Sequence, residues 1–202
     1  MKKINLKKGF TLIEMIVSLG IFTVVALIAV GALLKVMDAN RKAVNLKTAI
    51  NNMNFTIESM SREMRMGNDF YLNNNPDEEV KKDYTKSPSS INPSTSWLLA
   101  FRSSIISTND GKCNLIYAYR YTGTKLQKAQ QTKCSDKIKS ENFQDIIAPE
   151  IKLTLASIGL DKSPDIPDKV YFTFEGSTGL KVKDKTEFRV QSNITQRVMD
   201  KN

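Results

Sequence analysis

The longest hydrophobic segment of the chain lies close to its amino terminus. Residues 15–34 carry no charge, and at about 1.5 Å of rise per residue a helix of this length spans roughly 30 Å, the thickness of a bilayer's hydrocarbon core. A cleaved secretory signal fits less well, because its hydrophobic stretch is only about 7–15 residues long and a small-residue cleavage site follows it. Here that site, residues 30–32, lies inside the run. The pattern alone indicates a signal anchor with the rest of the chain exported.

The helix is expected to continue beyond the hydrophobic segment. Hydrophobic residues recur at heptad spacing over residues 36–64, with polar residues between them, which indicates an amphipathic helix. Gly67 should end it, so we expect a helix over residues 10–66, about 85 Å long at ~1.5 Å per residue. A coiled-coil dimer could use the same stripe, but packing against the chain's own sheet is favoured. The stripe consists of Val36, Ala39, Ala43, Leu46, Ile50, Met53, Ile57, Met60 and Met64.

The segment that follows the helix is polar. Residues 73–96 contain three prolines and few bulky hydrophobic side chains. A loop of this length is unusual within a compact domain. We expect an exposed connection across 68–96.

The second half of the chain alternates hydrophobic and polar residues in short runs. Alternation of this kind is typical of an antiparallel sheet with one buried face. A single long helix over that face gives an α+β domain, so the predicted fold is one long N-terminal helix packed on an antiparallel β-sheet. The expected strands are 97–106, 114–121, 125–132, 150–155, 169–175 and 186–196.

Composition narrows the classes of function. The chain has no histidine, which removes the commonest general base and the commonest zinc ligand. No arrangement of a nucleophile with a base is legible, so neither an enzyme nor a bound cofactor is expected. The net charge is +9, but four lysines precede Gly9, and the remainder is only mildly basic.

The two cysteines fit a hairpin. Gly123 and Thr124 suit a two-residue type II′ turn, whose first position prefers glycine. Counting pairs outward from this turn places Cys113 opposite Cys134, at a non-hydrogen-bonded rung where side chains approach closely. In an exported domain we expect a disulfide there, with two reduced buried thiols as the alternative.

Residues 7–14 read KKGFTLIE. This run resembles the processing motif of type IV prepilins and type II secretion pseudopilins, in which a short basic leader ends in glycine and Phe-Thr-Leu-Ile-Glu opens a hydrophobic helix. The resemblance implies that the prepilin peptidase/methyltransferase cuts between Gly9 and Phe10 and methylates the new amino terminus of Phe10. The helix would then stay attached and pack with other pilins or pseudopilins.

The resemblance also suggests a role for Glu14. A carboxylate in hydrocarbon is costly unless it is paired. Cleavage creates a cationic amine at Phe10, one helical turn away, and a neighbouring subunit's amine can play the same part in a filament. We therefore expect Glu14 to set the register of helices during assembly.

Other segments look like minor pilins and J-type pseudopilins, namely 54–70, "IYAYRYTGTKL" and "FRVQSNITQR". A minor pilin assembled near the filament tip is the first expectation, and a type II secretion or competence pseudopilin is the alternative. The implied location is a single-pass inner membrane protein with a cytoplasmic amino terminus, and later a filament on the surface or in the periplasm. The implied organisation is a removed leader (1–9), a membrane helix (10–34), its amphipathic continuation (35–67), a polar loop region (68–96) and a β-rich domain (97–202).

A DNA-binding or surface-binding module displayed on the filament is the alternative from another class. Lysines crowd the second hairpin strand and its exit, and tyrosines stand nearby, as DNA uptake would require for phosphates and bases. A solvated, lysine-rich edge strand is the commoner reason for such a pattern. The lysines are Lys125, Lys128, Lys133, Lys137 and Lys139, and the tyrosines are Tyr117, Tyr119 and Tyr121.

Three acidic residues form a weak calcium candidate, since some pseudopilins hold calcium in a loop. Asp161, Asp165 and Asp168 lie close in sequence, but their spacing is not that of an EF-hand loop. Pro164 and Pro167 suit a plain turn. No metal site is expected.

Overall fold

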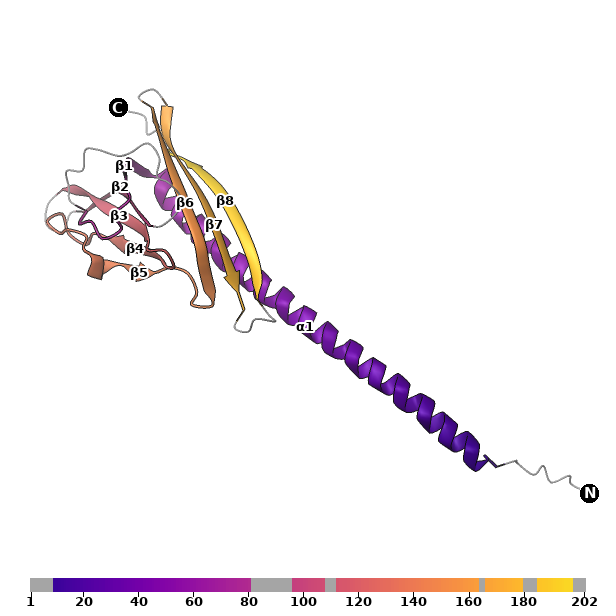
Figure 1. Cartoon of the computed structure of the whole chain (residues 1–202). Coiled ribbons are helices and arrows are strands. Elements are labelled where there is room, and N and C mark those ends of the chain that lie inside the picture. The colour runs from indigo at the N-terminus through magenta and orange to yellow at the C-terminus, as the bar shows by residue number, and fades with distance from the viewer. Residues whose placement is uncertain (1–8, 81–95, 108–111, 164–165, 180–184, 198–202) are drawn as a thin grey trace, which may run out of the picture. The chain divides into compact units, whose positions relative to one another are not determined.

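The computed structural model describes residues 9–80, 96–107, 112–163, 166–179 and 185–197 (Figure 1). A long helix, α1 (Leu12–Arg65), comes first and antiparallel strands follow. The predicted α+β class is confirmed. The strands are β1 (Gly67–Asn73), β2 (Trp97–Ser107), β3 (Cys113–Tyr121), β4 (Leu126–Gln130), β5 (Gln144–Asp145), β6 (Ile151–Ser163), β7 (Ile166–Thr178) and β8 (Thr186–Thr195), with a short 3-10 helix, η1 (Ser140–Asn142).

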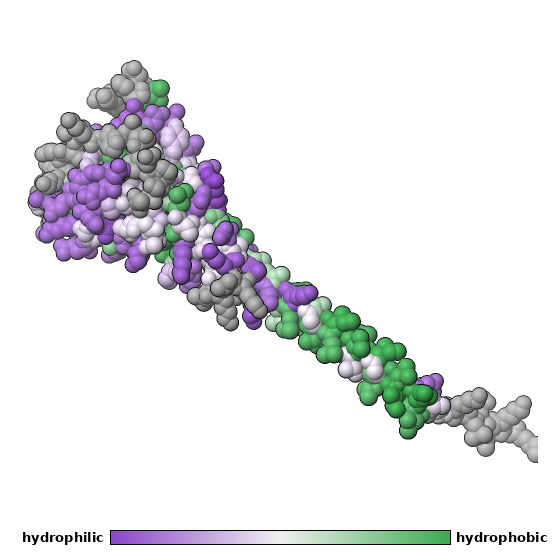
Figure 2. Space-filling model, in the orientation of Figure 1, coloured by the Kyte–Doolittle hydropathy of each residue, from purple (hydrophilic) through white to green (hydrophobic). Residues whose placement is uncertain are grey.

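The chain divides into two compact units, Met1–Ala43 and Val44–Asn202. In the first unit the described residues form the start of α1, and its hydrophobic side chains are exposed. Figure 2 shows them as a continuous hydrophobic surface along this part of the helix. None of this hydrophobic stretch is buried within the chain. By length and composition this helix is able to cross a membrane.

In the second unit α1 buries one face. The buried side chains recur every three or four residues, as a helix packed on one side requires. They are Ala49, Met53, Thr56, Ile57, Met60 and Met64. The helical stripe therefore packs on the chain's own strands, as expected, but only from about Leu46 onward, because Val36, Ala39 and Ala43 are exposed.

The described strands form two sheets, so the single sheet expected from the sequence is wrong. One sheet has the order β1-β2-β3-β4-β5 and the other has the order β6-β7-β8. Their inner faces and α1 enclose the main core, in which Phe101, Tyr119, Phe172 and Phe174 are buried. The Trp97 side chain ties the sheets together, because its Nε1 donates a hydrogen bond of 2.7 Å to the carbonyl oxygen of Ala156 on β6.

The five-stranded sheet is covered on its outer face as well. Val80, Leu98, Ala100, Ile116, Ala118, Ala129, Ile138 and Phe143 form a second, smaller hydrophobic cluster there. Strands β2 and β3 are thus buried on both faces, and their sequences are nearly continuous hydrophobic runs. The sequences of these two strands do not alternate between hydrophobic and polar residues. The predicted sheet with only one covered face is therefore wrong for them.

Arg120 fastens the outer cover. Its guanidinium is nearly buried, pairs with the Asp77 carboxylate at 3.0 Å and donates to the Ser140 hydroxyl oxygen at 3.0 Å. It also lies over the ring of Phe143, 4.1 Å from the centroid. A buried cation is stable only with such partners. Arg120 therefore joins the segment of Asp77 to the segment of Ser140 over the outer face of the sheet.

The predicted polar loop across 68–96 is wrong at its beginning. Residues of β1 pair with β2, and Phe70 and Leu72 are buried. Val80 is also buried, and its backbone pairs with Ile138. The asparagines around these side chains concealed a strand whose alternate residues are hydrophobic. Residues 81–95 of the predicted loop lie outside the described residues.

Candidate functional site

Gly9 and Phe10 stand immediately before α1 and are both exposed. A Cβ atom placed on Gly9 would meet no other atom within 4 Å. Phe10 is 83 % exposed. The folded chain itself therefore does not require glycine at this position, and the peptide bond between the two residues is open to an enzyme.

Glu14 caps the start of α1. One of its carboxylate oxygens, Oε2, accepts hydrogen bonds from the backbone N–H and the hydroxyl of Thr11, both at 3.1 Å. In return the Glu14 N–H donates to Thr11 Oγ1 at 3.3 Å. This reciprocal pair is a capping box, which satisfies two backbone donors at a helix start. The sequence interpretation missed it, although Thr-x-x-Glu before a hydrophobic run is its signature.

Beyond Glu14 the helix offers a long hydrophobic surface with no covering side chains in the described first unit. Ile16, Leu19, Leu27 and Val30 are each more than half exposed. Residues 4–30 match a family model described as the prokaryotic N-terminal methylation motif. The chain carries the type IV prepilin and pseudopilin signal. No curated protein and no solved structure matches the chain significantly.

The match confirms the prepilin-type signal suggested by the KKGFTLIE run. The prepilin signal and the hydrophobic helix together fit a single-pass membrane anchor. They also imply processing by a prepilin peptidase and assembly with other pilins. In the structure α1 begins inside the prepilin signal. Leu12 is the first residue of the helix and Thr11 is its cap.

The disulfide predicted in the globular unit of this prepilin-type chain is present. Cys113 and Cys134 are bonded, with their Cα atoms 5.8 Å apart. The predicted hairpin register is also observed, since Tyr121 pairs with Leu126, and Gly123 at the turn has a φ of 89°. That angle favours glycine.

The expected rung between the cysteines is absent from this ladder. The β3–β4 pairing ends at Gln130, followed by one more bond from the Gln131 N–H to the carbonyl oxygen of Ile116. The buried Gln131 side chain then holds the turn that follows the strand, because its Nε2 donates hydrogen bonds to the backbone oxygens of Cys134 and Asp136. Cys134 reaches Cys113 from a turn and not from a strand.

The lysines of the hairpin mostly face acidic partners. Lys125 pairs with Asp145 at 3.1 Å and Lys128 with Glu63 at 2.5 Å. Lys137 and Lys139 lie 3.8 and 3.7 Å from Glu79 and Glu141 respectively, and Lys133 is exposed. Their charges are therefore largely balanced within the chain.

The neighbouring tyrosines are not available to stack on bases. Tyr117, Tyr119 and Tyr121 are all at least nine-tenths buried. The Tyr119 hydroxyl donates to Glu63 at 2.6 Å, and burial together with that carboxylate raises the pKa of Tyr119 far above its ordinary value. The interpretation that grouped these rings with the lysines as a DNA-contacting surface is wrong about the rings.

The acidic residues of the calcium candidate fall on the β6–β7 hairpin. Asp161 is exposed on β6, Asp168 is half-buried on β7, and Asp165 lies outside the described residues. Burial raises the pKa of Asp168. Among the residues that the structure describes, no three acidic, cysteine or histidine side chains gather as metal ligands would.

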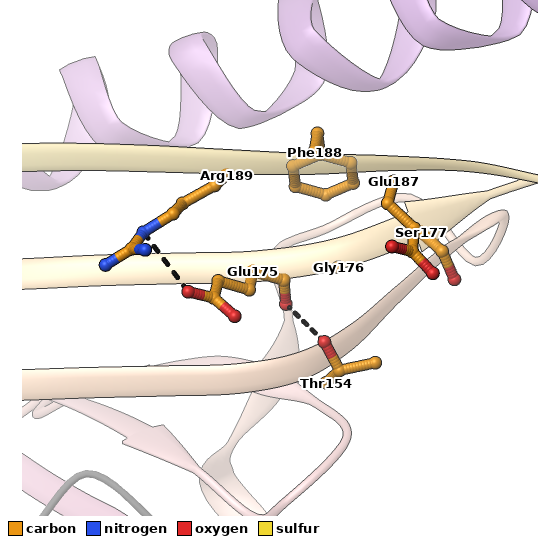
Figure 3. A pocket seen from close by; sticks show the side chains of 7 residues that line it. All are labelled: Thr154, Glu175, Gly176, Ser177, Glu187, Phe188 and Arg189. Atoms are coloured by element: carbon orange, nitrogen blue, oxygen red, sulfur yellow. Dashed lines mark hydrogen bonds and ion pairs between the residues drawn. The ribbon is translucent and has the colours of Figure 1, made fainter.

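A hollow of about 450 Å³ lies on the three-stranded sheet (Figure 3). It arises from a bulge, because Thr154 has no partner in the register that pairs Leu153 with Gly176 and Leu155 with Glu175. A Cβ on Gly176 would lie 2.7 Å from the Lys152 carbonyl oxygen, so no side chain fills the space.

The charges around this hollow cancel. Glu175 pairs with Arg189 at 3.1 Å across the strands, and Glu187 pairs with Lys185 at 3.5 Å. The remaining lining consists of hydroxyl and hydrophobic side chains. Ser177 lies opposite Glu187 in the β7–β8 register, but among the described lining residues no hydrogen bond joins a hydroxyl to a carboxylate, so the hollow shows no activated nucleophile.

Proposed function

We propose that the protein is a structural subunit of a type IV pilus-like filament, a minor pilin that assembles near the tip and performs no catalysis. One observation carries the proposal. The prepilin signal opens a helix whose first half exposes its hydrophobic side chains. Such a surface needs lipid or other hydrophobic helices around it, and a filament core supplies the helices after the membrane has held the subunit.

The proposed path begins in the inner membrane. The peptidase/methyltransferase cuts between Gly9 and Phe10 and methylates Phe10, while the lysines of the leader keep the amino terminus in the cytoplasm. The globular unit is exported, and its disulfide is consistent with an oxidising compartment. The subunit then leaves the membrane for a filament on the surface or in the periplasm.

A pseudopilin of a type II secretion or competence system is the second candidate, since the same signal and helix serve both. The two are separated by location and phenotype. A pilin is recovered in filaments sheared from the cell surface, and its deletion reduces piliation. A pseudopilin is absent from sheared filaments, and its deletion blocks export of secreted enzymes or uptake of DNA.

The assembly role is tested at Glu14, and the capping box supplies a matched control. Glu14→Ala removes both the charge and the cap. Glu14→Gln removes the charge but leaves an oxygen that accepts the Thr11 N–H. Thr11→Ala removes the hydroxyl of the cap but keeps the carboxylate.

If the Phe10 amine needs a counter-charge, both Glu14 variants are processed and inserted yet enter filaments poorly, while Thr11→Ala assembles normally. The measurement is the ratio of this protein in sheared filaments to that in membranes, with filament numbers counted beside it. Equal defects in Thr11→Ala and Glu14→Ala, with Glu14→Gln normal, would make Glu14 a helix cap only. An unchanged ratio for every variant would remove its assembly role.

A further inference from the structure

Strand β8 has an open edge next to α1. In the part of the chain that the structure describes, β8 pairs only with β7. The Gln196 N–H donates to the Asp168 carbonyl oxygen of β7 at 2.9 Å, and the register continues from there without a bulge. Because hydrogen-bonded pairs alternate along an antiparallel ladder, the odd-numbered residues of β8 direct their backbone groups away from β7.

The next residue supports this assignment. The Arg197 N–H points away from β7 and donates to the carbonyl oxygen of Arg65, at the end of α1, at 2.9 Å. The open backbone groups of β8 therefore face the same side as the last turns of the helix. Those of Asn193 and Thr195, which precede Arg197, come next along this edge.

A groove of about 910 Å³ lies between the open edge and the helix. On one side it is lined by Asn193, Thr195 and Arg197, and on the other by Glu58, Arg62 and Arg65. All belong to the globular unit. An extended chain laid in this groove would reach the unpaired backbone of β8 while alternate side chains faced the helix.

The groove is positively charged. Arg62 pairs with Glu58 at 3.4 Å, which leaves Arg65 and Arg197 without an acidic partner among the described residues. A second copy of this chain stays positively charged even without its four leader lysines, so it is a poor electrostatic match. An acidic partner is favoured.

An exposed aromatic side chain extends the same helical face. Phe55 is 72 % exposed, although it belongs to the globular unit and not to the hydrophobic half of α1. It precedes Glu58 by three residues and Arg62 by seven, so the three lie on one side of the helix. Phe55 offers a hydrophobic contact at the end of the positively charged groove.

We propose that the groove between β8 and α1 binds an extended acidic segment of another protein, which adds to β8 as a further strand. Backbone hydrogen bonds to the odd-numbered residues would provide affinity, and the arginines would select acidic side chains. This surface is separate from the helix-mediated assembly proposed above, and neither proposal depends on the other.

The test uses the full-length protein in detergent micelles. The probe is a fluorescent ten-residue peptide of alternating glutamate and valine with blocked ends, and its binding is followed by anisotropy at low salt. One matched peptide carries N-methyl groups on alternate amides along one edge, with a companion methylated on the other edge. A third peptide has lysine in place of glutamate.

Two sets of protein variants separate backbone pairing from charge. Asn193→Pro removes an outward N–H, which an edge strand tolerates, and Asn193→Ala keeps it. Arg62→Glu with Arg65→Glu reverses the groove's charge. Lys133→Glu with Lys152→Glu makes the same change in net charge at exposed sites outside the groove.

We expect one methylated peptide, the lysine peptide, the proline variant and the arginine variant each to bind at least about tenfold more weakly, with both control variants within twofold of wild type. Thermal unfolding of every variant confirms that it is folded. Equal binding by both methylated peptides would reduce the interaction to ionic attraction and overturn strand addition. Absent binding, or a wild-type dimer that Asn193→Pro abolishes, would overturn the proposed partner.

Discussion

Removal of the disulfide is the sharpest test of the globular unit's stability. The change is Cys113→Ser with Cys134→Ser. The bridge spans 21 residues of sequence, and a loop of that length restricts the unfolded chain by about 3 kcal/mol in the loop-entropy estimate. Since an unfolding domain of this size shifts its melting temperature by roughly 2–4 °C per kcal/mol, we expect a melting temperature about 6–12 °C lower.

Loss of the disulfide should change the structure and the free energy of the folded state little. Gln131 is buried and holds the same segment through its side chain, which accepts from the Ile116 N–H at 3.1 Å and donates to the Asp136 carbonyl oxygen at 2.7 Å. The turn that carries Cys134 therefore keeps its anchor without the sulfur bridge. The loss of stability comes chiefly from the greater freedom of the unfolded chain.

The assay is calorimetry or circular dichroism on a protein lacking residues 1–34, with and without reductant. Reductant should lower the melting temperature of the wild type and leave that of the double variant unchanged, which controls for general effects of the reagent. A difference below about 2 °C between oxidised and reduced wild type would refute the entropic argument. Two free thiols per chain in protein recovered from its exported location would refute the bridge itself.

Three further predictions concern single residues. Gly9→Val should block cleavage without disturbing the fold, because the space around Gly9 is empty, and mass spectrometry should find N-methylated Phe10 only in the wild type. Gly67→Ala should destabilise the globular unit by about 1–3 kcal/mol in denaturant titrations, since the new Cβ would stand 2.4 Å from the Phe101 ring. Burial, followed by the Glu78 carboxylate, raises the pKa of Tyr71 to about 12, above its ordinary value of 10.0. Its neutral phenol therefore stabilises the fold fully below pH 10 and ceases to do so as the pH rises through about 12, so Tyr71→Phe should weaken the alkaline loss of stability.

Local signals in the sequence were sufficient for the helix and for most strands. The helix ends at Arg65, one residue before its predicted end, and Gly67 then opens β1, where the absence of a side chain admits the close approach of Phe101. The second half of the heptad stripe, which contains three methionines, correctly predicted the buried face of α1. The hairpin register followed from Gly123, since a two-residue turn determines the register of both strands. The disulfide was also predicted, but the rung expected between its cysteines is absent and Cys134 lies in a turn.

Tertiary packing decided what these signals missed. Trp97–Phe101 is hydrophobic at successive positions, which marks a strand covered on both faces, but the covering segments are polar and gave no hint of it. No pattern in the sequence indicates that Arg120 is buried, whereas the fold places it among Asp77, Ser140 and Phe143. Long-range partners of this kind leave no periodic trace in a single sequence.

The functional segment shows the same contrast between local and non-local information. The processing motif and the hydrophobic helix are local patterns, and both were predicted from the sequence. The capping box of Thr11 and Glu14 is also a local pattern, since Thr-x-x-Glu stands directly before the hydrophobic run. The buried tyrosines could not be placed from sequence, since alternation alone does not say which face of a strand points inward.

The heptad stripe links fold to function, because its regularly spaced hydrophobic residues extend beyond the part of α1 that is buried. Val36, Ala39 and Ala43 continue the spacing of Met53 and Met60, yet they are exposed while the methionines are buried under the chain's own sheets. A stripe maintained without an internal partner is costly in water. If the protein is a filament subunit, these positions have a use, since helices of neighbouring subunits would cover them. Polar replacement of Val36 and Ala43 should then reduce incorporation into filaments while leaving the melting temperature of the globular unit unchanged.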